Sequence, residues 1–437
     1  MRVGVIGTGH VGLVTCVTLA EFGHDVVGVD ADEEKVARLQ EGKVPFFEPG
    51  LQQLLDKTLS QGRLTFSTDA ASAIADREIV FICVGTPPRA SGEANLVAVE
   101  NVARQVAKDG SSSLIVVEKS TVPTGTADRI RRTIALEMRA SVGGIEVVSN
   151  PEFLREGTAI EDSLRPSRIL VGADSPRGHA AMRRLYARSL EEGTPLIETN
   201  IKTAELAKHA ANAFLALKIS YVNALARVCE RTGADVVAVA DVMGSDPRIG
   251  RAFLDAGLGY GGFCFPKDLD AFEHLAAQAG YDFPLLREIR RINEEAVDAV
   301  LVKVREGLWN LEGKRVALFG LAFKPGTDDI RFSPALSLAR RLIEEGATVV
   351  GYDPEAMAGA KEEIPELELA SDGYAAAADA HCVVICTEWA EFRDMDLNVL
   401  SEMMAYPMVV DGRNVFGPDE MRSLGFTYYP TGRQAIA

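Results

Sequence analysis

The chain begins Met1-Arg-Val-Gly-Val-Ile-Gly7-Thr-Gly9-His10-Val11-Gly12, a short apolar run that closes on three spaced glycines. A helical run follows, and a second apolar run then ends on Asp30. The order strand, G-x-G-x-x-G, helix, strand and acid is typical of a dinucleotide-binding α/β unit. The glycines permit a tight turn and the approach of a pyrophosphate, to which the helix N-terminus offers N–H groups. We expect Asp30 to bind an adenosine ribose and to favour NAD, because a 2′-phosphate would meet its charge.

The composition bounds the class of protein. A length of 437 residues predicts two or three domains. The net charge of −17 argues against nucleic-acid and anionic-membrane partners, which bind clustered Lys and Arg. The six cysteines show neither disulfide nor zinc spacing, which indicates a reducing cytoplasm and no metal site. A strand directly after Met1 and the absence of long apolar runs predict neither a signal peptide nor a membrane span.

Polar residues follow three further apolar runs, which we expect to be strands at Glu78–Val84, Leu114–Glu118 and Ile145–Val148. Thr86 and Thr121 follow the first two, and Glu152 and Glu156 follow the third. All four therefore lie at the rim where open parallel sheets bind ligands. Each also has a structural explanation, because threonine is common in turns and acids complement the first turn of a helix. The two glutamates would share one face if their segment begins a helix.

An alanine-rich helical pattern runs from Lys202 to Arg231, and one stripe of it contains Ala204, Lys208, Ala211, Asn212, Leu215 and Ile219. Lys208 and Asn212 lie one turn apart among small and apolar residues. Such a pair could stabilise a developing oxyanion, although a lysine on a helix usually faces solvent. The helical region continues to about Gly307 and is more apolar than one stripe requires, so we expect it to form a dimer interface.

Gly259-Tyr-Gly-Gly-Phe-Cys264-Phe-Pro-Lys267-Asp268 is a candidate nucleophile motif. Its glycines allow close approach of the backbone to a ligand, and Pro266 stiffens the chain. Lys267 could favour the thiolate of Cys264, and Asp268 supplies a carboxylate for orientation or proton transfer. The alternative is a buried structural cysteine, as most free cysteines are.

The last third of the chain repeats the α/β pattern. A strand at Arg315–Gly320 is followed by Glu345–Asp353, which echoes Phe22–Asp30 and indicates a second Rossmann-like unit. Its turn lacks G-x-G-x-x-G, so Lys324 and Arg331 suit a different phosphorylated or anionic ligand. Arg413 follows the expected strand Met408–Asp411. We predict two Rossmann-like, doubly wound parallel-sheet domains at residues 1–198 and 307–437, joined by a central helical region at 199–306.

The motifs together resemble the UDP-glucose/GDP-mannose dehydrogenase family of nucleotide-sugar 6-dehydrogenases. The similarity covers the whole chain and rests on Gly7–Gly12 with Asp30, Ser120–Pro123, Asn150–Leu154, Glu205–Asn212, Gly261–Asp268 and Gly320–Arg331. The family resemblance implies an NAD domain, a helical dimerisation region and a carboxy-terminal nucleotide-binding domain, as the α/β pattern also predicts.

By this resemblance, the reaction is a four-electron oxidation of a sugar C6 alcohol to a carboxylate, with two NADH per turnover. Cys264 would capture the intermediate aldehyde as a thiohemiacetal, which is oxidised to a thioester and hydrolysed. Lys208 and Asn212 would stabilise the oxyanions. Glu152 would be the hydrolytic base through a water, and Asp268 a supporting base or orienting group.

The resemblance also implies the binding residues and a homodimer. The residues for NAD are Gly7, Gly9, His10, Val11, Gly12, Asp30, Lys35, Thr86, Thr121, Glu156, Lys267 and Arg331. Those for a UDP-sugar are Glu152, Phe153, Leu154, Arg155, Glu156, Lys208, Asn212, Phe253, Leu254, Asp255, Ala256, Gly257, Tyr260, Gly261, Lys324 and Arg413, with Arg248 supplied across the dimer.

Two positions depart from many family members. Phe263 stands where a serine precedes the cysteine, and Phe332 stands where a glutamate follows Arg331; both could alter the sugar pocket. Phe265 favours members that convert UDP-glucose to UDP-glucuronate, because GDP-mannose members tend to have leucine there. The alternatives are GDP-mannose or UDP-N-acetylhexosamine oxidation by the same chemistry, a two-electron NAD-dependent hydroxyacid dehydrogenase without a thiol, and an inactive sugar-nucleotide sensor.

Overall fold

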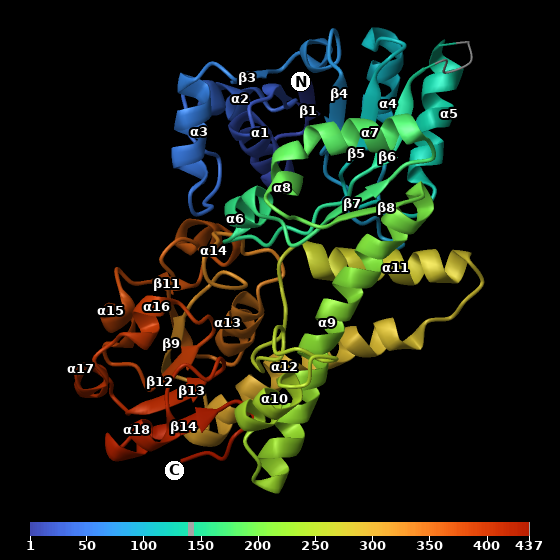
Figure 1. Ribbon diagram of the computed structural model, residues 1–437. Helices are drawn as coiled ribbons and strands as arrows, with labels where there is room; N and C mark the ends of the chain where they lie inside the picture. The colour runs from blue at the N-terminus through green and yellow to red at the C-terminus, as the bar shows by residue number, and fades with distance from the viewer. Residues whose placement is uncertain (139–143, 437) are drawn as a thin grey trace. The chain divides into compact units, whose positions relative to one another are not determined.

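The computed structural model describes residues 1–138 and 144–436, which form two compact units (Figure 1). The first unit contains Met1–Ala211 with Asp270–Tyr281, and the second contains Asn212–Leu269 with the chain from residue 282 onward. Each unit is built on one β-sheet. The predicted class, two Rossmann-like α/β domains with a helical region between them in the sequence, is confirmed. The exact domain boundaries at residues 198 and 306 stay a prediction.

The sheet of the first unit has eight strands in the order β3-β2-β1-β4-β5-β6-β7-β8. The strands are β1 (Arg2–Ile6), β2 (Asp25–Val29), β3 (Leu64–Ser67), β4 (Ile79–Ile82), β5 (Ile115–Glu118), β6 (Glu146–Ser149), β7 (Ile169–Gly172) and β8 (Leu196–Thr199). Neighbours pair in parallel except β6 and β7, which meet antiparallel at Ser149 and Gly172. The first six strands follow the Rossmann order, so their carboxyl ends form the rim that the sequence predicts.

Helices cover both faces of this sheet because its central strands are apolar on both sides. In β5, Ile115 and Val117 join one core and Val116 joins the other. Such strands are typical of parallel sheets buried between helical layers. One layer contains α1 (His10–Glu21), α3 (Leu51–Ser60) and α7 (Pro176–Leu185), and the other contains α4 (Val97–Asp109) and α5 (Thr126–Met138). The short helices are α2 (Glu33–Gln40), α6 (Ala159–Leu164), α8 (Ala187–Glu191) and a 3-10 turn, Ala70–Ala73.

Four helices follow in the sequence: α9 (Ile201–Thr232), α10 (Val236–Gly244), α11 (Cys264–Gln278) and α12 (Pro284–Leu308). The predicted alanine-rich helix is α9, a single element of 32 residues. The C-terminal part of α9 and α10 share a small core with the segment before the cysteine motif, formed by Val222, Ala226, Cys229, Val236, Ala240, Leu254 and Ala256. No helix of residues 1–138 and 144–436 is long and apolar enough to cross a membrane.

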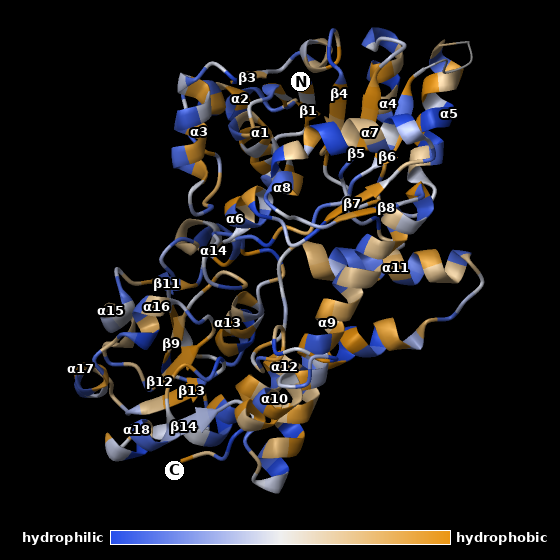
Figure 2. Ribbon diagram, viewed as in Figure 1, coloured by the Kyte–Doolittle hydropathy of each residue, from blue (hydrophilic) through white to orange (hydrophobic). Residues whose placement is uncertain are grey.

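The second sheet has six strands in the order β11-β10-β9-β12-β13-β14, which repeats the topology of β1 to β6. All its neighbours are parallel, and the strands are β9 (Arg315–Phe319), β10 (Thr348–Tyr352), β11 (Glu368–Leu369), β12 (Cys382–Ile385), β13 (Met408–Asp411) and β14 (Thr427–Pro430). Helices α12 and α13 (Pro334–Glu344) pack on one face. The other face holds α15 (Gly373–Ala377), α16 (Ala390–Arg393), α17 (Leu397–Met403) and α18 (Pro418–Ser423); α14 (Met357–Glu363) precedes β11. Figure 2 shows β9 and β12 in hydrophobic colours.

The acid after the second strand differs between the two sheets. Asp353 follows β10 as Asp30 follows β2. Asp353 is completely buried, and it accepts backbone hydrogen bonds from Leu321, Ala322, Glu355 and Ala356 at 2.7 to 3.1 Å. Its carboxylate therefore holds the strand-to-helix corner together and has no capacity left for a ribose.

Candidate active site

The glycine-rich loop has the geometry of a dinucleotide turn. Gly7 has a φ of +96°, and a Cβ on Gly12 would lie 1.7 Å from the carbonyl oxygen of Gly7. Both glycines are therefore required by the protein's own packing. A Cβ on Gly9 would meet no atom of the described residues within 4 Å. Protein packing does not explain Gly9, but close approach of a pyrophosphate at the N-terminus of α1 does.

Asp30 stands at the end of β2 beside this loop. Its Oδ2 accepts hydrogen bonds from the Thr8 backbone N–H at 2.8 Å and from Lys35 Nζ at 3.0 Å. Burial opposes ionisation, but these hydrogen bonds outweigh it and lower the pKa of Asp30. Among the described residues, Oδ1 accepts a single hydrogen bond, from the Asp32 backbone. Because an ionised carboxylate oxygen has further acceptor capacity, Asp30 fits the predicted ribose contact.

His10 is held in place by residues that sequence analysis missed. Its ring stacks on Phe46 with centroids 4.0 Å apart, and its Nε2 lies 3.3 Å from Glu48 Oε2. Buried Glu48 also accepts hydrogen bonds from the backbone of Gly157 and Ala159 at 2.8 and 2.7 Å. Glu48 thus connects the glycine-rich loop to the start of α6. Because its backbone partners lie over 100 residues away, only the Glu-Pro-Gly turn signal at 48–50 marks it in the sequence.

Lys208 and Glu152 form a buried ion pair in the first unit. Lys208 Nζ lies 3.1 Å from Glu152 Oε1, and the two side chains are 4% and 7% exposed. The alternative of a solvated lysine is therefore wrong. Lys208 also lies 5.4 Å from the centre of the Phe153 ring, and the Arg168 guanidinium lies 3.7 Å from the same centre. Keeping two charged groups out of water costs free energy, and buried ion pairs of this kind often mark functional sites. The pair is therefore a strong functional candidate.

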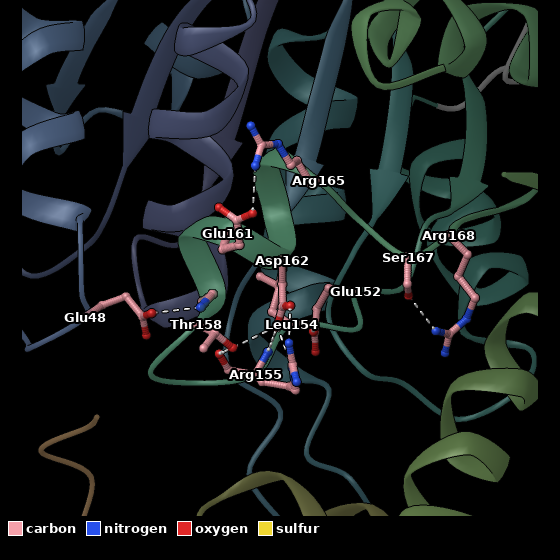
Figure 3. A network of polar contacts seen from close by, with 11 residues as sticks. Glu48, Glu152, Leu154, Arg155, Thr158, Glu161, Asp162, Arg165, Ser167 and Arg168 are labelled. Atoms are coloured by element: carbon pink, nitrogen blue, oxygen red, sulfur yellow. Dashed lines mark hydrogen bonds and ion pairs between the residues drawn. The ribbon is translucent and has the colours of Figure 1, made fainter. Parts of the chain in front are cut away.

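The segment that follows Glu152 is not helical. Residues 151–158 form loops and turns, and α6 begins only at Ala159, so Glu152 and Glu156 do not share a helix face. Glu152 folds back on its own chain, where Oε2 accepts the Leu154 N–H at 2.5 Å. Exposed Arg155 makes a two-pronged contact with Asp162, at 2.7 and 2.9 Å (Figure 3). Hydrogen bonds of these side chains shape this loop, and the helix propensity of the sequence does not reveal them.

Cys264 is the first residue of α11 and is exposed. The other five cysteines, all in the described part of the chain, are buried, and burial raises the pKa of Cys83 and of Cys386 to about 12. Those thiols stay protonated at neutral pH. A cysteine at a helix N-terminus gains instead from the helix dipole and adjacent N–H groups, which stabilise a thiolate. The alternative of a buried structural cysteine is wrong for Cys264.

Asp268, one turn into α11, contacts two other predicted residues. Its Oδ2 accepts a hydrogen bond from Asn212 Nδ2 at 2.6 Å, and its Oδ1 pairs with Lys267 Nζ. Asp268, Asn212 and Lys267 are all buried. The amide of Asn212 and the ammonium of Lys267 are thereby fixed beside the turn that carries Cys264.

Phe263 precedes the cysteine and contacts two cations. The Arg331 guanidinium lies 4.6 Å from the centre of its ring, and Lys267 Nζ lies 5.7 Å away. Arg331 also makes a two-pronged contact with Asp329, at 2.8 and 2.7 Å. Phe332, the other departure from the family pattern, is 59% exposed with a φ of +53°, a strained conformation for a non-glycine residue. Both departures therefore flank Arg331.

The glycines of the cysteine motif are required by the facing loop. A Cβ on Gly261 would lie 2.4 Å from the carbonyl oxygen of Phe332, and one on Gly262 would lie 2.8 Å from the Phe323 ring. The Gly262 N–H donates to the Arg331 carbonyl at 2.9 Å. The loop after β9 and the cysteine turn are thus in backbone contact, although some 70 residues separate them in sequence.

The predicted sugar-nucleotide residues gather around this loop. A Cβ on Gly257 would lie 3.0 Å from Arg413 Nη1, and Arg413 donates to the carbonyls of Cys386 and Phe323 at 2.8 and 3.4 Å. Lys324 lies 5.5 Å from the Phe323 ring. These facts bring Gly257, Gly261, Lys324 and Arg413 to one region of the second unit.

Two asparagines that sequence analysis missed support the same region. Asn223 accepts the Gly257 N–H at 2.8 Å, and Asn293 binds both the N–H and the carbonyl of Tyr260, at 2.7 and 3.0 Å. Phe253 keeps a φ of +65°. Arg248 is 87% exposed and pairs with Asp246, so the structure does not bring it to the other predicted residues of its unit. In the sequence, Asn223 and Asn293 are marked only as polar residues within expected helices.

Comparison with known proteins gives matches along the whole chain. Three models of the UDP-glucose/GDP-mannose dehydrogenase family match: the NAD binding domain at residues 1–190, the central domain at 202–295 and the UDP binding domain at 317–418. The chain is 45% identical to a UDP-glucose 6-dehydrogenase of Rhizobium meliloti, covering 99% of this chain and 100% of that protein.

Solved structures are similar over the same extent. A UDP-glucose dehydrogenase from Pyrobaculum islandicum has a TM-score of 0.90 at 38% identity, covering 99% of this chain and 98% of its own. A UDP-D-ManNAc dehydrogenase from Pyrococcus horikoshii has a TM-score of 0.87 at 26% identity, with both chains fully covered.

Proposed function

The chain belongs to the UDP-glucose/GDP-mannose dehydrogenase family, and from this premise we propose that it oxidises UDP-glucose to UDP-glucuronate, with two NAD reduced per turnover. The predicted family and the NAD cofactor agree with the matched domains. The observation that carries the proposal is exposed Cys264 at the N-terminus of α11, next to the buried group of Lys267, Asp268 and Asn212. A two-electron dehydrogenase has no use for this thiol.

The thiol makes the second oxidation possible. Loss of a proton and a hydride from the C6 alcohol gives an aldehyde, which has no hydride to lose until a nucleophile adds to its carbonyl. Cys264 Sγ forms a bond to C6 and gives a thiohemiacetal. Loss of a second hydride and of the hydroxyl proton gives a thioester, and water cleaves the C6–S bond to release the carboxylate and restore the thiol. Bound NAD would supply the hydride acceptor for both oxidations.

The remaining catalytic assignments follow the charges of the site. Lys208 and Asn212, on the same helix, are proposed to stabilise the negative oxygen at C6 in each step. Glu152 is proposed to take the proton of the hydrolytic water, and its Oε1 lies 3.1 Å from Lys208 Nζ. Asp268 fixes the Asn212 amide. Asn212 then offers a donor that needs no reorganisation as charge develops.

Cofactor binding is assigned to the rim of the first sheet. Gly7, Gly9 and Gly12 with the N-terminus of α1 would take the pyrophosphate, and Asp30 with Lys35 the adenosine ribose. The open position beside Gly9 and the unused capacity of Asp30 Oδ1 fit this cofactor. Thr86 and Thr121 would contact the nicotinamide side, and His10, Val11, Glu156, Lys267 and Arg331 complete the proposed NAD set.

We assign the UDP-sugar to the residues that the family resemblance implies. Lys324 and Arg413 would neutralise the diphosphate, against the net negative charge of the chain. Phe253, Leu254, Asp255, Ala256, Gly257, Tyr260 and Gly261 would line the nucleotide, and Glu152, Phe153, Leu154, Arg155 and Glu156 the sugar. The matched UDP binding domain supports a UDP-sugar ligand.

We also propose that the protein is a cytoplasmic homodimer. Phe214, Tyr221 and Val228 recur every seven residues on α9, and all three are exposed, as is Val242 on α10. A regular apolar stripe of this kind favours a helix-to-helix contact, and exposed Arg248 is then available to the partner subunit's site. The six free cysteines favour a reducing compartment. Light scattering of wild type and Tyr221→Glu tests the dimer; a monomeric wild-type protein would exclude it.

The test of function is NADH stoichiometry with product identification for UDP-glucose, GDP-mannose and UDP-N-acetylhexosamines. We expect UDP-glucose to have the highest kcat/KM and to yield two NADH and UDP-glucuronate. A ratio of one with released aldehyde would support the hydroxyacid-type alternative. Preference for another sugar nucleotide at a ratio of two would keep the chemistry and move the substrate assignment, and binding without any change at 340 nm would indicate a sensor.

A further inference from the structure

One turn of helix α9 holds the loop that follows β5. Glu205 Oε2 accepts the Gly125 N–H at 2.6 Å, and Oε1 accepts the Ala127 N–H at 2.9 Å. One turn later, His209 Nε2 donates to the Val122 carbonyl oxygen at 2.9 Å. Glu205 and His209 are 2% and 1% exposed. Two buried side chains on one helix thus fix both ends of the loop segment 122–127.

The same loop is fixed on its other side by the strand ends. Thr86 Oγ1 donates to the Thr121 carbonyl oxygen at 2.9 Å, and Ser120 Oγ donates to the Val84 carbonyl oxygen at 2.9 Å. Thr121, a proposed cofactor contact, lies in the chain between Ser120 and Val122, which are both held by these contacts. Its main-chain position is therefore set jointly by the β4 end and by α9.

The turn of α9 that holds the loop also carries Lys208. Lys208 lies between Glu205 and His209 in sequence and pairs with Glu152 at 3.1 Å. Any shift of α9 relative to the loop would therefore change the distance between Thr121 and the Lys208–Glu152 pair, all of which belong to the first unit. Geometry at this scale matters, because displacements near 1 Å are enough to reduce catalysis strongly.

A purely structural role does not account for both contacts. Glu205 alone could be a cap for α5, since the N–H groups that it accepts belong to the first turn of that helix and the residue before it. His209 binds Val122, four residues before α5 begins, where no helix cap is needed. The pair restrains the loop itself.

We propose that Glu205 and His209 are positioning residues for the cofactor site. They hold Thr121 at a fixed position relative to Lys208 and so determine the affinity for NAD. The inference rests on the proposed function in one respect, the assignment of Thr121 to NAD. It predicts an effect on NAD that exceeds any effect on the sugar nucleotide.

Glu205 also makes the hold on the loop after β5 dependent on pH. Burial raises the pKa of Glu205, and the Gly125 and Ala127 N–H bonds oppose the rise without cancelling it. The charged groups that face it are Glu118 on β5, Asp128 on α5 and Lys202 on α9. When Glu205 is protonated it loses the charge that strengthens these two hydrogen bonds. We therefore expect the KM for NAD to rise as the pH falls, beginning at a higher pH than an ordinary glutamate would require.

The test uses matched variants in the full-length protein. Glu205→Gln keeps the shape and removes the charge, His209→Gln keeps a donor N–H, and His209→Leu removes it; Ala210→Ser, exposed on the same turn, is the control. We expect Glu205→Gln and His209→Leu to raise the KM for NAD roughly tenfold, with that for UDP-glucose changed by less than about twofold. His209→Gln should recover most of the loss, and Glu205→Gln should flatten the pH dependence.

Direct titration of NAD by calorimetry separates this inference from the proposed function, since it needs no turnover. An unchanged affinity for NAD in folded Glu205→Gln and His209→Leu would overturn the inference even if wild type yields two NADH per UDP-glucose. An equal loss for both ligands, with a lower melting temperature, would assign the pair to folding alone and would also overturn it. If Glu205→Gln does not fold, the comparison of His209→Leu with His209→Gln decides.

Discussion

The guanidinium of Arg331 stacks on the ring of Phe263, 4.6 Å from its centre, directly before the proposed nucleophile Cys264. Arg331 therefore contacts the side chain of the residue directly before Cys264. In many family members a serine at this position offers no ring. The stack and the Asp329 contact together fix a cation that we assign to the cofactor.

Replacement of Phe263 should weaken NAD binding. A cation–π contact at a half-exposed site is worth about 0.5–2 kcal/mol, so Phe263→Ser should raise the KM for NAD by roughly 2- to 30-fold. Phe263→Leu, which keeps apolar volume without the ring, should behave like serine, and Phe263→Tyr like wild type. Steady-state kinetics with varied NAD measures this. Wild-type behaviour of the leucine variant would mean that volume, and not the ring, is what matters.

Cys264→Ser should separate the two oxidations. Substrate and NAD binding should stay near normal, because the side chain is exposed and changes by one atom. Carboxylate formation should fall by at least about 100-fold, since a serine hydroxyl at this position lacks the nucleophilicity of a thiolate. Product analysis after long incubation checks the outcome. Normal formation of UDP-glucuronate by this variant would end the thioester mechanism.

Asp30→Ala should alter the choice of cofactor. The variant loses a charged acceptor, so NAD affinity should fall by about 10- to 100-fold, as expected for a charge-assisted hydrogen bond of about 1.5–3 kcal/mol. Discrimination against NADP should relax because the carboxylate no longer repels a 2′-phosphate. The ratio of kcat/KM values for NAD and NADP measures this directly. An unaltered ratio would place the discriminating acid elsewhere.

Glu118 should make stability fall as the pH rises above the ordinary range of a glutamate pKa. It is 1% exposed at the end of β5, and neither carboxyl oxygen has a hydrogen-bond partner among the described residues. Burial raises the pKa of Glu118 well above its usual range. A carboxyl whose pKa is raised on folding stabilises the fold while it is protonated, and this contribution is lost as the pH rises through the folded pKa.

Glu118→Gln, which mimics the protonated acid, should therefore change the melting temperature little at pH 5 and raise it relative to wild type at pH 9. Thermal unfolding at several pH values measures the difference. A constant offset between the two proteins across this range would show that Glu118 does not titrate there.

Local patterns predicted the elements better than the contacts between them. Continuous apolar runs placed β1, β2, β4 and β5, because strands buried on both faces are apolar almost throughout. The echo between Phe22–Asp30 and Glu345–Asp353 identified the second sheet. The helix suggested by the spacing of Glu152 and Glu156 does not form, since Glu152 binds the Leu154 N–H locally. A carboxylate that binds its own backbone competes with helix formation, and spacing alone does not show this.

Contacts over long sequence separations could not be predicted. Glu48 with Ala159, Phe263 with Arg331, and Asn293 with Tyr260 each depend on how loops from different elements meet. The candidate residues of the site were found because their chemistry is unusual for their position. Their supporting partners have ordinary chemistry, and only the fold makes them significant.

The buried carboxylate of Asp353 limits how the second Rossmann-like sheet can change. Each of its oxygens already accepts two backbone N–H groups, so no nearby substitution can free it for a new ligand while the corner stays folded. An engineer who wished to turn the carboxy-terminal half into another hydride-carrier module would have to rebuild that corner before choosing any ligand contact. The second sheet thus repeats the architecture of the first without keeping an acid that could bind a second ribose.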